Sequence, residues 1–308
     1  MMALAQIETI VDGVFERARA VTTGHVTTYI PELAHVDPNL FAVSICDVSG
    51  AEINRGDFEY LFTMQSISKV LSYACALDVC DRSRLDERVG VEATGEEFDS
   101  IIKLDRHKRP FNPMVNAGAI AVTDLLMTQY GSRALPETLA FFGRLIGRAD
   151  LAIDEDVHRS ELRTGERNRA IAHLLKNFGL LDHPVEDVLS LYFAHCAVQL
   201  TTRDLARLGA TLATRSCPSG MVRHSTLRDV LSVMLTCGMY NYAGQWVFEV
   251  GYPAKSGVSG GLLSVVPDRA GIGVFSPRVD DKGSSPRGVL VNRMLSEQAN
   301  LHLFACAQ

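Results

Sequence analysis

The spacing of apolar residues predicts a helix and then a strand in the first fifty residues of the chain. Near the N-terminus, apolar positions recur at helical spacing with acidic residues between them, which is typical of an amphipathic helix. These positions are Ile7, Ile10, Val11, Val14 and Phe15. The segment from Leu40 to Val48 is β-branched and apolar and turns at Ser49-Gly50. That pattern predicts a strand leading into a hairpin.

The middle of the chain, from Ser66 to about Ala213, has mostly helical patterns. Helices are predicted over residues 117–130, 135–146 and 186–199. A further helix is expected to start in the segment Thr202-Arg203-Asp204-Leu205, with a threonine as its cap. After the turn-rich residues 215–220, a last helix of this region should run to about Cys237.

Strand patterns return towards the C-terminus at residues 246–250, 262–266 and 272–275, and residues 289–303 are helical again. Strands from both ends of the chain therefore flank a helical middle. The economical arrangement is an α/β (α+β) fold, with one antiparallel sheet flanked by helices and an inserted all-helical domain. We expect a discontinuous sheet domain at 1–65 and 220–308, a helical domain at 66–219, and the active site between them.

Composition limits the class of protein. The chain has 308 residues, of which 47% are hydrophobic and 21% charged, as in ordinary soluble globular proteins. A net charge of −6 argues against a general nucleic-acid binder. No apolar run approaches the length of a membrane span. The N-terminus lacks the basic-then-apolar pattern of a signal peptide, so we expect a cytoplasmic protein.

The cysteines and histidines give no sign of a metal site. The seven cysteines form no C-x-x-C pair, so reduced thiols are expected, and the nine histidines include no H-E-x-x-H. Adjacent residues on a helix point apart, so His195-Cys196 is interpreted as core filling rather than as a catalytic pair. We expect neither a metal nor an organic cofactor.

Two separate motifs carry most of the chemical information. Ser66-Ile67-Ser68-Lys69 is an S-x-x-K sequence, and Lys255-Ser256-Gly257 is a K-S-G sequence far downstream. This pairing occurs in serine acyl-transfer enzymes of the β-lactamase and penicillin-binding type. A serine and a lysine three residues apart share one face of a helix, so the amine can take the proton of the hydroxyl. The alternative is that Ser66 only caps the helix that follows it.

Two further motif matches are expected to be structural. Ser100-Ile101-Ile102-Lys103 also fits S-x-x-K but precedes a charged run, which is typical of a solvated surface segment. The segment from Gly257 to Gly261 matches the G-x-S-x-G of a nucleophile elbow, but a strand rather than a helix follows it. We interpret it as a glycine-rich bend between two strands that forms one wall of an oxyanion site.

Several polar residues are candidates for substrate binding. Asn116 immediately precedes a predicted helix, where it either caps the helix or directs its amide into a cleft. Glu161 and Asn168 lie in a segment predicted as a polar, solvated loop. Tyr192 lies in an apolar helix, where a core tyrosine is the alternative. Tyr240 follows a predicted helix end.

Taken together, these segments identify a family resemblance: the chain resembles the serine-dependent glutaminases, which hydrolyse L-glutamine to L-glutamate and ammonia. The likeness covers nearly all of the chain, in order. It is carried by residues 29–34, 66–69, 112–119, 161–168, 192–193, 238–240, 253–258 and 301–304.

The resemblance implies a β-lactamase-like fold and a set of roles. Ser66 would be the nucleophile, Lys69 its base and Tyr240 a partner in proton transfer, with Lys255 in support. The backbone N–H groups of Ser66 and Val258 would hold the oxyanion. The amino and carboxylate groups of glutamine would lie among Tyr29, Asn116, Glu161, Asn168 and Tyr192.

We interpret the chain as an L-glutamine amidohydrolase that works through a seryl acyl-enzyme. We expect it to form a homo-oligomer, a dimer or a tetramer, and to bind neither nucleic acid nor membrane. Two alternatives stay open. One is another serine acylase of the same fold, a β-lactamase or a penicillin-binding enzyme. The other is a non-catalytic relative that binds a ligand without turning it over.

Overall fold

A central antiparallel sheet joins the two ends of the chain. The computed structural model describes residues 4–95, 104–105, 107–214 and 222–305. Five strands lie in the order β3-β2-β8-β7-β6. They are β2 (Ala42–Asp47), β3 (Glu52–Gly56), β6 (Ala254–Ser256), β7 (Gly261–Val266) and β8 (Ala270–Phe275). β2 pairs with β3 in the predicted hairpin and with β8 from the other end of the chain, which confirms the antiparallel sheet.

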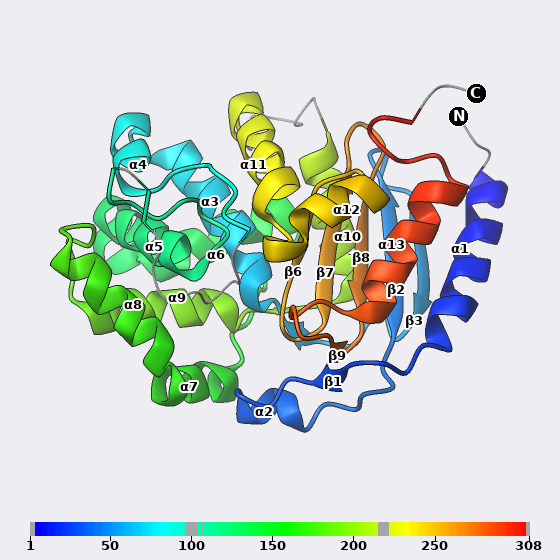
Figure 1. Cartoon of the computed structure of the whole chain (residues 1–308), viewed down its shortest axis with the longest axis horizontal. Helices are drawn as coiled ribbons and strands as arrows, with labels where there is room; N and C mark the ends of the chain where they lie inside the picture. The colour runs from blue at the N-terminus through cyan, green and yellow to red at the C-terminus, as the bar shows by residue number, and fades with distance from the viewer. Residues whose placement is uncertain (1–3, 96–103, 106, 215–221, 306–308) are drawn as a thin grey trace.

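Helices cover both faces of this sheet. α1 (Leu4–Arg19) and α13 (Pro286–Gln298) pack together on one face, and α10 (Thr202–Ala213) covers the other (Figure 1). α10 comes very close because β8 carries glycines there. A Cβ built on Gly271 would lie 2.2 Å from the Ala206 carbonyl oxygen, and one on Gly273 would lie 2.4 Å from the Thr202 carbonyl oxygen. Larger residues would push α10 off the sheet.

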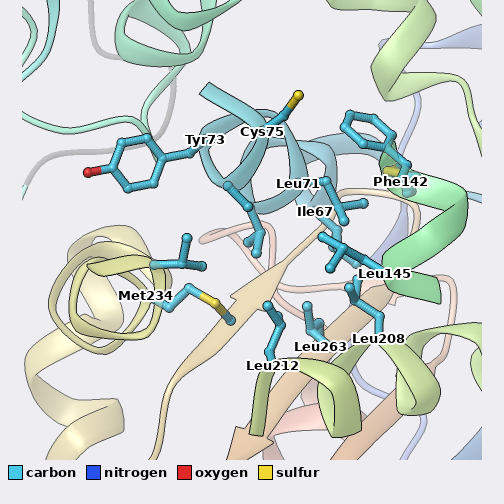
Figure 2. Close-up of a cluster of buried hydrophobic side chains, with 14 of the residues drawn as sticks. Ile67, Leu71, Tyr73, Cys75, Phe142, Leu145, Leu208, Leu212, Met234 and Leu263 are labelled. Atoms are coloured by element: carbon cyan, nitrogen blue, oxygen red, sulfur yellow. The ribbon is translucent and has the colours of Figure 1, made fainter. Parts of the chain in front are cut away.

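Most of the other helices gather beside the sheet (Figure 1). They are α3 (Ser68–Val79), α4 (Arg82–Arg88), α5 (Asn116–Tyr130), α6 (Ala134–Ile146), α7 (Glu155–Thr164), α8 (Glu166–Asn177), α9 (Val185–Cys196) and α11 (His224–Cys237). Apolar side chains connect them to the sheet. Leu71 of α3 and Phe142 of α6 belong to the same buried cluster as Leu208 of α10 and Leu263 of β7 (Figure 2). This packing fixes α3 relative to the sheet.

Short elements complete the chain. β1 (His25–Val26) pairs with β9 (Arg278–Val279), and β4 (Phe62–Thr63) pairs with β5 (Gln199–Leu200). The short helices are α2 (Pro31–Ala34) and α12 (Ala243–Glu249), and the 3₁₀ turns are η1 (Gln65–Ile67), η2 (Gly131–Arg133) and η4 (Tyr240–Tyr242). Within the described ranges, no helix is both long and apolar enough to cross a bilayer.

The structure corrects several predicted elements. Residues 246–250, predicted as a strand, lie mainly in helix α12, so that prediction was wrong. The helix predicted over 186–199 ends at Cys196, and the C-terminal helix ends at Gln298 rather than 303. The threonine cap of α10 is Thr201, which forms a capping box with Asp204. Residues 100–103 and 215–220 lie outside the described part of the chain.

Candidate active site

Ser66 and Lys69 form a close pair where the η1 turn runs into helix α3. The Lys69 ammonium nitrogen Nζ lies 2.5 Å from Ser66 Oγ. Ser66 is partly exposed, whereas Lys69 is only 1% exposed. The cap residue of α3 is Ile67, so Ser66 does not cap this helix. The serine hydroxyl therefore faces a buried amine and can still be reached from outside.

The surroundings of Lys69 favour its neutral form. Burial lowers its pKa to about 8, against the opposing effects of Cys196 and Glu161. An ordinary lysine has a pKa near 10.5 and carries a proton at neutral pH. An amine with a pKa of about 8 is partly neutral near physiological pH, so it can accept a proton from the serine.

A second buried lysine lies close to the first. Lys255 on β6 donates to Tyr240 Oη at 2.7 Å and to the Ser256 carbonyl at 2.7 Å. Burial, with the neighbouring Lys69, holds the pKa of Lys255 well below its usual value. Gly238 explains how Tyr240 comes so near, because a Cβ there would lie 1.9 Å from the Ala254 carbonyl oxygen. The end of α11 thus packs directly on the backbone of β6.

The turn between β6 and β7 lies against the segment that carries Ser66. The Gly257 N–H donates to the Gly261 carbonyl, and Gly260 has a φ of +98°, which glycine adopts readily. A Cβ on Gly257 would lie 2.9 Å from the Met64 carbonyl oxygen. The Thr27 hydroxyl donates to the Val258 carbonyl at 2.6 Å. The predicted glycine-rich bend is confirmed, and Val258 directly follows Gly257, the residue that approaches the serine segment.

Three residues from separate helices form a hydrogen-bonded polar cluster. Asn116 Nδ2 donates to Asn168 Oδ1 at 2.9 Å, and Tyr192 Oη donates to Asn116 Oδ1 at 3.4 Å. Asn116 is the first residue of α5 and Val115 is its cap, so the Asn116 amide is not a helix cap. The Tyr192 ring centroid lies 5.8 Å from Lys69 Nζ. The cluster therefore borders the Ser66–Lys69 pair.

Glu161 is a buried carboxylate beside the same pair. It is 7% exposed and accepts a hydrogen bond from Gln65 Nε2 at 3.0 Å. Burial raises its pKa to about 7, while the bond from Gln65 and the charge of Lys69 act in the opposite direction. A buried carboxylate of this kind is a strong site for a substrate ammonium group.

The prediction of a polar loop over 161–168 was wrong. Glu161 lies in α7 and Asn168 in α8, and the two helices meet at Gly165. A Cβ at Gly165 would lie 2.5 Å from the ring of Phe193. Glycine therefore lets the two helices join against α9, which keeps Glu161 and Asn168 in fixed positions.

Tyr29 is 57% exposed and lies between two anchored points. On one side, Thr27 bonds to Val258. On the other side, the Ser160 hydroxyl donates to Glu32 Oε1 at 2.6 Å, which ties α2 to the helix that carries Glu161. Tyr29 thus lies on a segment that connects the glycine-rich turn to α7.

Sequence reasoning missed Gln65 and Thr27. Gln65 directly precedes Ser66, and its partner Glu161 is 96 positions away, so no local pattern links them.

His195 and Cys196 are both buried, as the core interpretation expected. Burial lowers the pKa of His195 to about 3, so it is neutral between Ser72 and Thr138. Across the described residues, no three His, Cys, Asp or Glu side chains group as metal ligands do.

Comparisons with known proteins point to one family. The model of the glutaminase family matches residues 24–304. A glutaminase of Trichormus variabilis is 49% identical over 97% of this chain and 91% of its own length. Glutaminase 2 of Clostridium perfringens is 40% identical over 92% of this chain and 95% of its own.

Solved structures give the same picture. The crystal structure of Mglu in its glutamate form has a TM-score of 0.92 and 39% identity, covering 100% of this chain and 72% of the other. The probable glutaminase ybaS has a TM-score of 0.90 and 33% identity, covering 99% and 100%. At 39% and 33% sequence identity, the two structures resemble this chain in sequence as well as in fold.

Proposed function

The chain belongs to the glutaminase family, and we propose that it hydrolyses L-glutamine through an acyl-enzyme formed on Ser66. As a glutaminase it converts L-glutamine and water to L-glutamate and ammonia. The observation that carries the proposed mechanism is the 2.5 Å contact between Lys69 Nζ and Ser66 Oγ. The short distance and the lowered pKa of Lys69 support its proposed role as the base that activates Ser66.

The reaction has two balanced halves. Neutral Lys69 takes the Ser66 proton as Oγ attacks the side-chain amide carbon of glutamine, and the C–N bond breaks after the nitrogen receives a proton. Ammonia leaves and a glutamyl ester stays on Ser66. Water then attacks the ester, which releases glutamate and restores the serine hydroxyl. Tyr240, which accepts a hydrogen bond from Lys255, would pass protons in both halves, and the influence of Lys69 on the pKa of Lys255 supports its place near the pair.

Backbone groups would hold the oxyanion of both halves. The N–H groups of Ser66 and Val258 are the proposed donors. Support comes from the close approach of Gly257 to Met64, which sets the glycine-rich turn against the serine segment. Preorganised donors of this kind stabilise charge that develops in the transition state.

The polar residues around the pair would clamp the amino-acid end of the substrate. Glu161 offers a carboxylate to the α-ammonium group. Tyr29, Asn116, Asn168 and Tyr192 offer amide and phenol donors to the α-carboxylate. The existing bonds among Asn116, Asn168 and Tyr192 would keep the clamp in place before substrate arrives.

We extend the proposal to the organisation of the protein. A β-lactamase-like arrangement would place a sheet domain at 1–65 and 220–308 against a helical domain at 66–219, with the site between them. α10 is an exception, because it lies within 66–219 yet packs on the sheet. A cytoplasmic homo-oligomer, dimer or tetramer, that needs no cofactor is the form we expect.

An assay with two substrates tests the function. Purified protein should release ammonia and glutamate in equal amounts from L-glutamine and should leave nitrocefin intact. Nitrocefin hydrolysis without glutamine hydrolysis would indicate a different serine acylase of this fold. Tight L-glutamate binding without turnover would indicate a non-catalytic relative.

The pH dependence of kcat should report Lys69. A base must be deprotonated to act, and burial lowers the pKa of Lys69 to about 8 in the free protein, so kcat should rise between about pH 6 and 9. Bound α-ammonium keeps Glu161 ionised, so its pKa of about 7 in the free protein should appear in kcat/KM alone. Glutamate release measured by chromatography gives both profiles. A kcat that declines steadily over this range would contradict a lysine base.

A further inference from the structure

Gln65 has an unusual backbone conformation next to the nucleophile. Its φ is +48°, in the left-handed region that glutamine rarely adopts, and the residue is 4% exposed. Such strain persists only where the surroundings over-determine the conformation, and it concentrates at functional sites. The Gln65 carbonyl accepts from the Ser68 N–H and so opens the turn that carries Ser66. The backbone of Gln65 therefore helps to set the position of the nucleophile.

The side chain of Gln65 reaches away from the nucleophile to the clamp. Its Nε2 group donates to Glu161 Oε1 at 3.0 Å and to Thr63 Oγ1 at 3.3 Å. An extended conformation at position 65 would direct the side chain elsewhere, so the left-handed backbone and the bond to Glu161 belong together. Gln65 is therefore bonded to Glu161 through its side chain and joined to Ser66 through its backbone.

The same connection exists in the backbone around the site. The Met64 N–H donates to the Val198 carbonyl, and the Asp154 N–H donates to the Ala197 carbonyl. Asp154 caps α7, the helix of Glu161, and also accepts from Gln199 Nε2 at 3.1 Å. Residues 197–199 therefore hold the nucleophile segment and the start of α7 in register. Gln65 links the nucleophile segment to α7 a second time, through its bond to Glu161.

We propose that Gln65 is a positioning residue that orients the Glu161 carboxylate for the substrate ammonium and couples this clamp to Ser66. The inference rests on the proposed function. An amide suits the role because it donates to a carboxylate without adding charge. A lysine or arginine here would neutralise Glu161 and compete with the ammonium group, and an acid would repel Glu161.

The electrostatics of Glu161 point the same way. Burial raises its pKa to about 7, and the hydrogen bond from Gln65 is the largest effect that opposes this rise. Loss of the bond should raise the pKa of Glu161 further. The substrate site would then lose its negative charge at a higher pH, and KM would increase most under mildly acidic conditions.

Replacement of Gln65 by asparagine tests the proposal. Asparagine tolerates the left-handed backbone better than glutamine, but it is one methylene shorter and cannot reach Glu161. KM for L-glutamine should rise by about 10- to 100-fold, the range of a hydrogen bond to a charged group, while kcat stays within about threefold. The acid limb of kcat/KM should also move to higher pH. An unchanged KM together with an unchanged acid limb would overturn the proposal.

A double-mutant cycle separates positioning from general loosening. In a Glu161→Gln background, Gln65→Asn should have little further effect on KM, because the two residues act as one unit. Additive effects would contradict the coupling. Gln199→Asn is the matched control, since it removes a similar bond in the adjacent ladder without touching Glu161. An equal rise of KM in this control would show that Gln65 acts only through local stability.

Binding of L-glutamate, followed by calorimetry, distinguishes this inference from the function on which it rests. If wild type binds L-glutamate but does not hydrolyse L-glutamine, the proposed function fails, and a weaker Kd in Gln65→Asn still supports the role of Gln65. If wild type hydrolyses L-glutamine and the variant binds L-glutamate equally well, the role of Gln65 fails alone.

Discussion

Replacement of Ser66 by alanine is expected to lower kcat for L-glutamine by about 10⁴-fold or more. The variant removes the hydroxyl that lies 2.5 Å from Lys69 Nζ, and with it the only acceptor for the acyl group in the proposed mechanism. The methyl group of alanine leaves the turn and the buried base in place. Initial rates of glutamate release, measured at saturating L-glutamine, give the comparison.

Binding and a neighbouring serine supply the controls for this variant. Ser66→Ala should still bind L-glutamate in calorimetry, because Glu161 and the asparagine cluster are intact. Ser259 lies in the glycine-rich turn, and its buried Oγ has no hydrogen-bond partner among the described residues, so Ser259→Ala should keep near-normal kcat. The same result is expected for Ser100→Ala. Near-normal turnover by Ser66→Ala would rule out the acyl-enzyme.

The parts of the site that follow local rules could be predicted from the sequence. Ser66 and Lys69 lie three positions apart on one helical face, and Lys255 lies on a strand before a glycine-rich bend. Spacing and turn chemistry specify both arrangements. Contacts across long separations could not be found in this way. The bond from Gln65 to Glu161 depends on how α7 packs beside the η1 turn. No local sequence pattern predicts that packing.

The incorrect strand at 246–250 shows a second limit. Trp246, Val247 and Phe248 have high strand propensity, and a short apolar run cannot be assigned from propensity alone. In the structure Trp246 and Val250 are buried and Phe248 is 85% exposed, which is helical spacing. Trp246 Nε1 also donates to the Tyr252 carbonyl. Burial of Trp246 and Val250 on one face therefore favours helix α12 over a strand.

The loop prediction for residues 161–168 was wrong because the segment is polar rather than apolar. Few of its residues are apolar, so it was predicted as a solvated loop. The helices α7 and α8 have polar outer faces, and α7 begins at the Asp154 cap, whose side chain accepts from the N–H groups of Asp156 and Val157. Attention to the cap and to Gly165 as a junction would have predicted two helices here.

L-Glutamine should be preferred over L-asparagine by about 10³-fold or more in kcat/KM. The clamp would hold the α-amino and α-carboxylate groups, so the distance from Glu161 to Ser66 fixes the length of the substrate. Asparagine lacks one methylene, and its amide carbon would stop about 1 Å short of Ser66 Oγ. Lost methylene contacts give only about 10–200-fold, and a displacement of about 1 Å costs on the order of 10² more.

Glu161→Ala should remove much of this preference by weakening the use of L-glutamine severely. Glu161 is buried, so its loss leaves the substrate ammonium without a counter-charge in a desolvated site, which is far more costly than losing a surface ion pair. Glu166→Ala is a matched control, because Glu166 starts the adjacent helix α8, is exposed, and pairs only with Arg169 in the described contacts. We would measure kcat/KM for both amides with wild type and both variants. Comparable rates on the two amides, or an indifferent Glu161→Ala variant, would refute the clamp and return the other serine acylases of this fold to consideration.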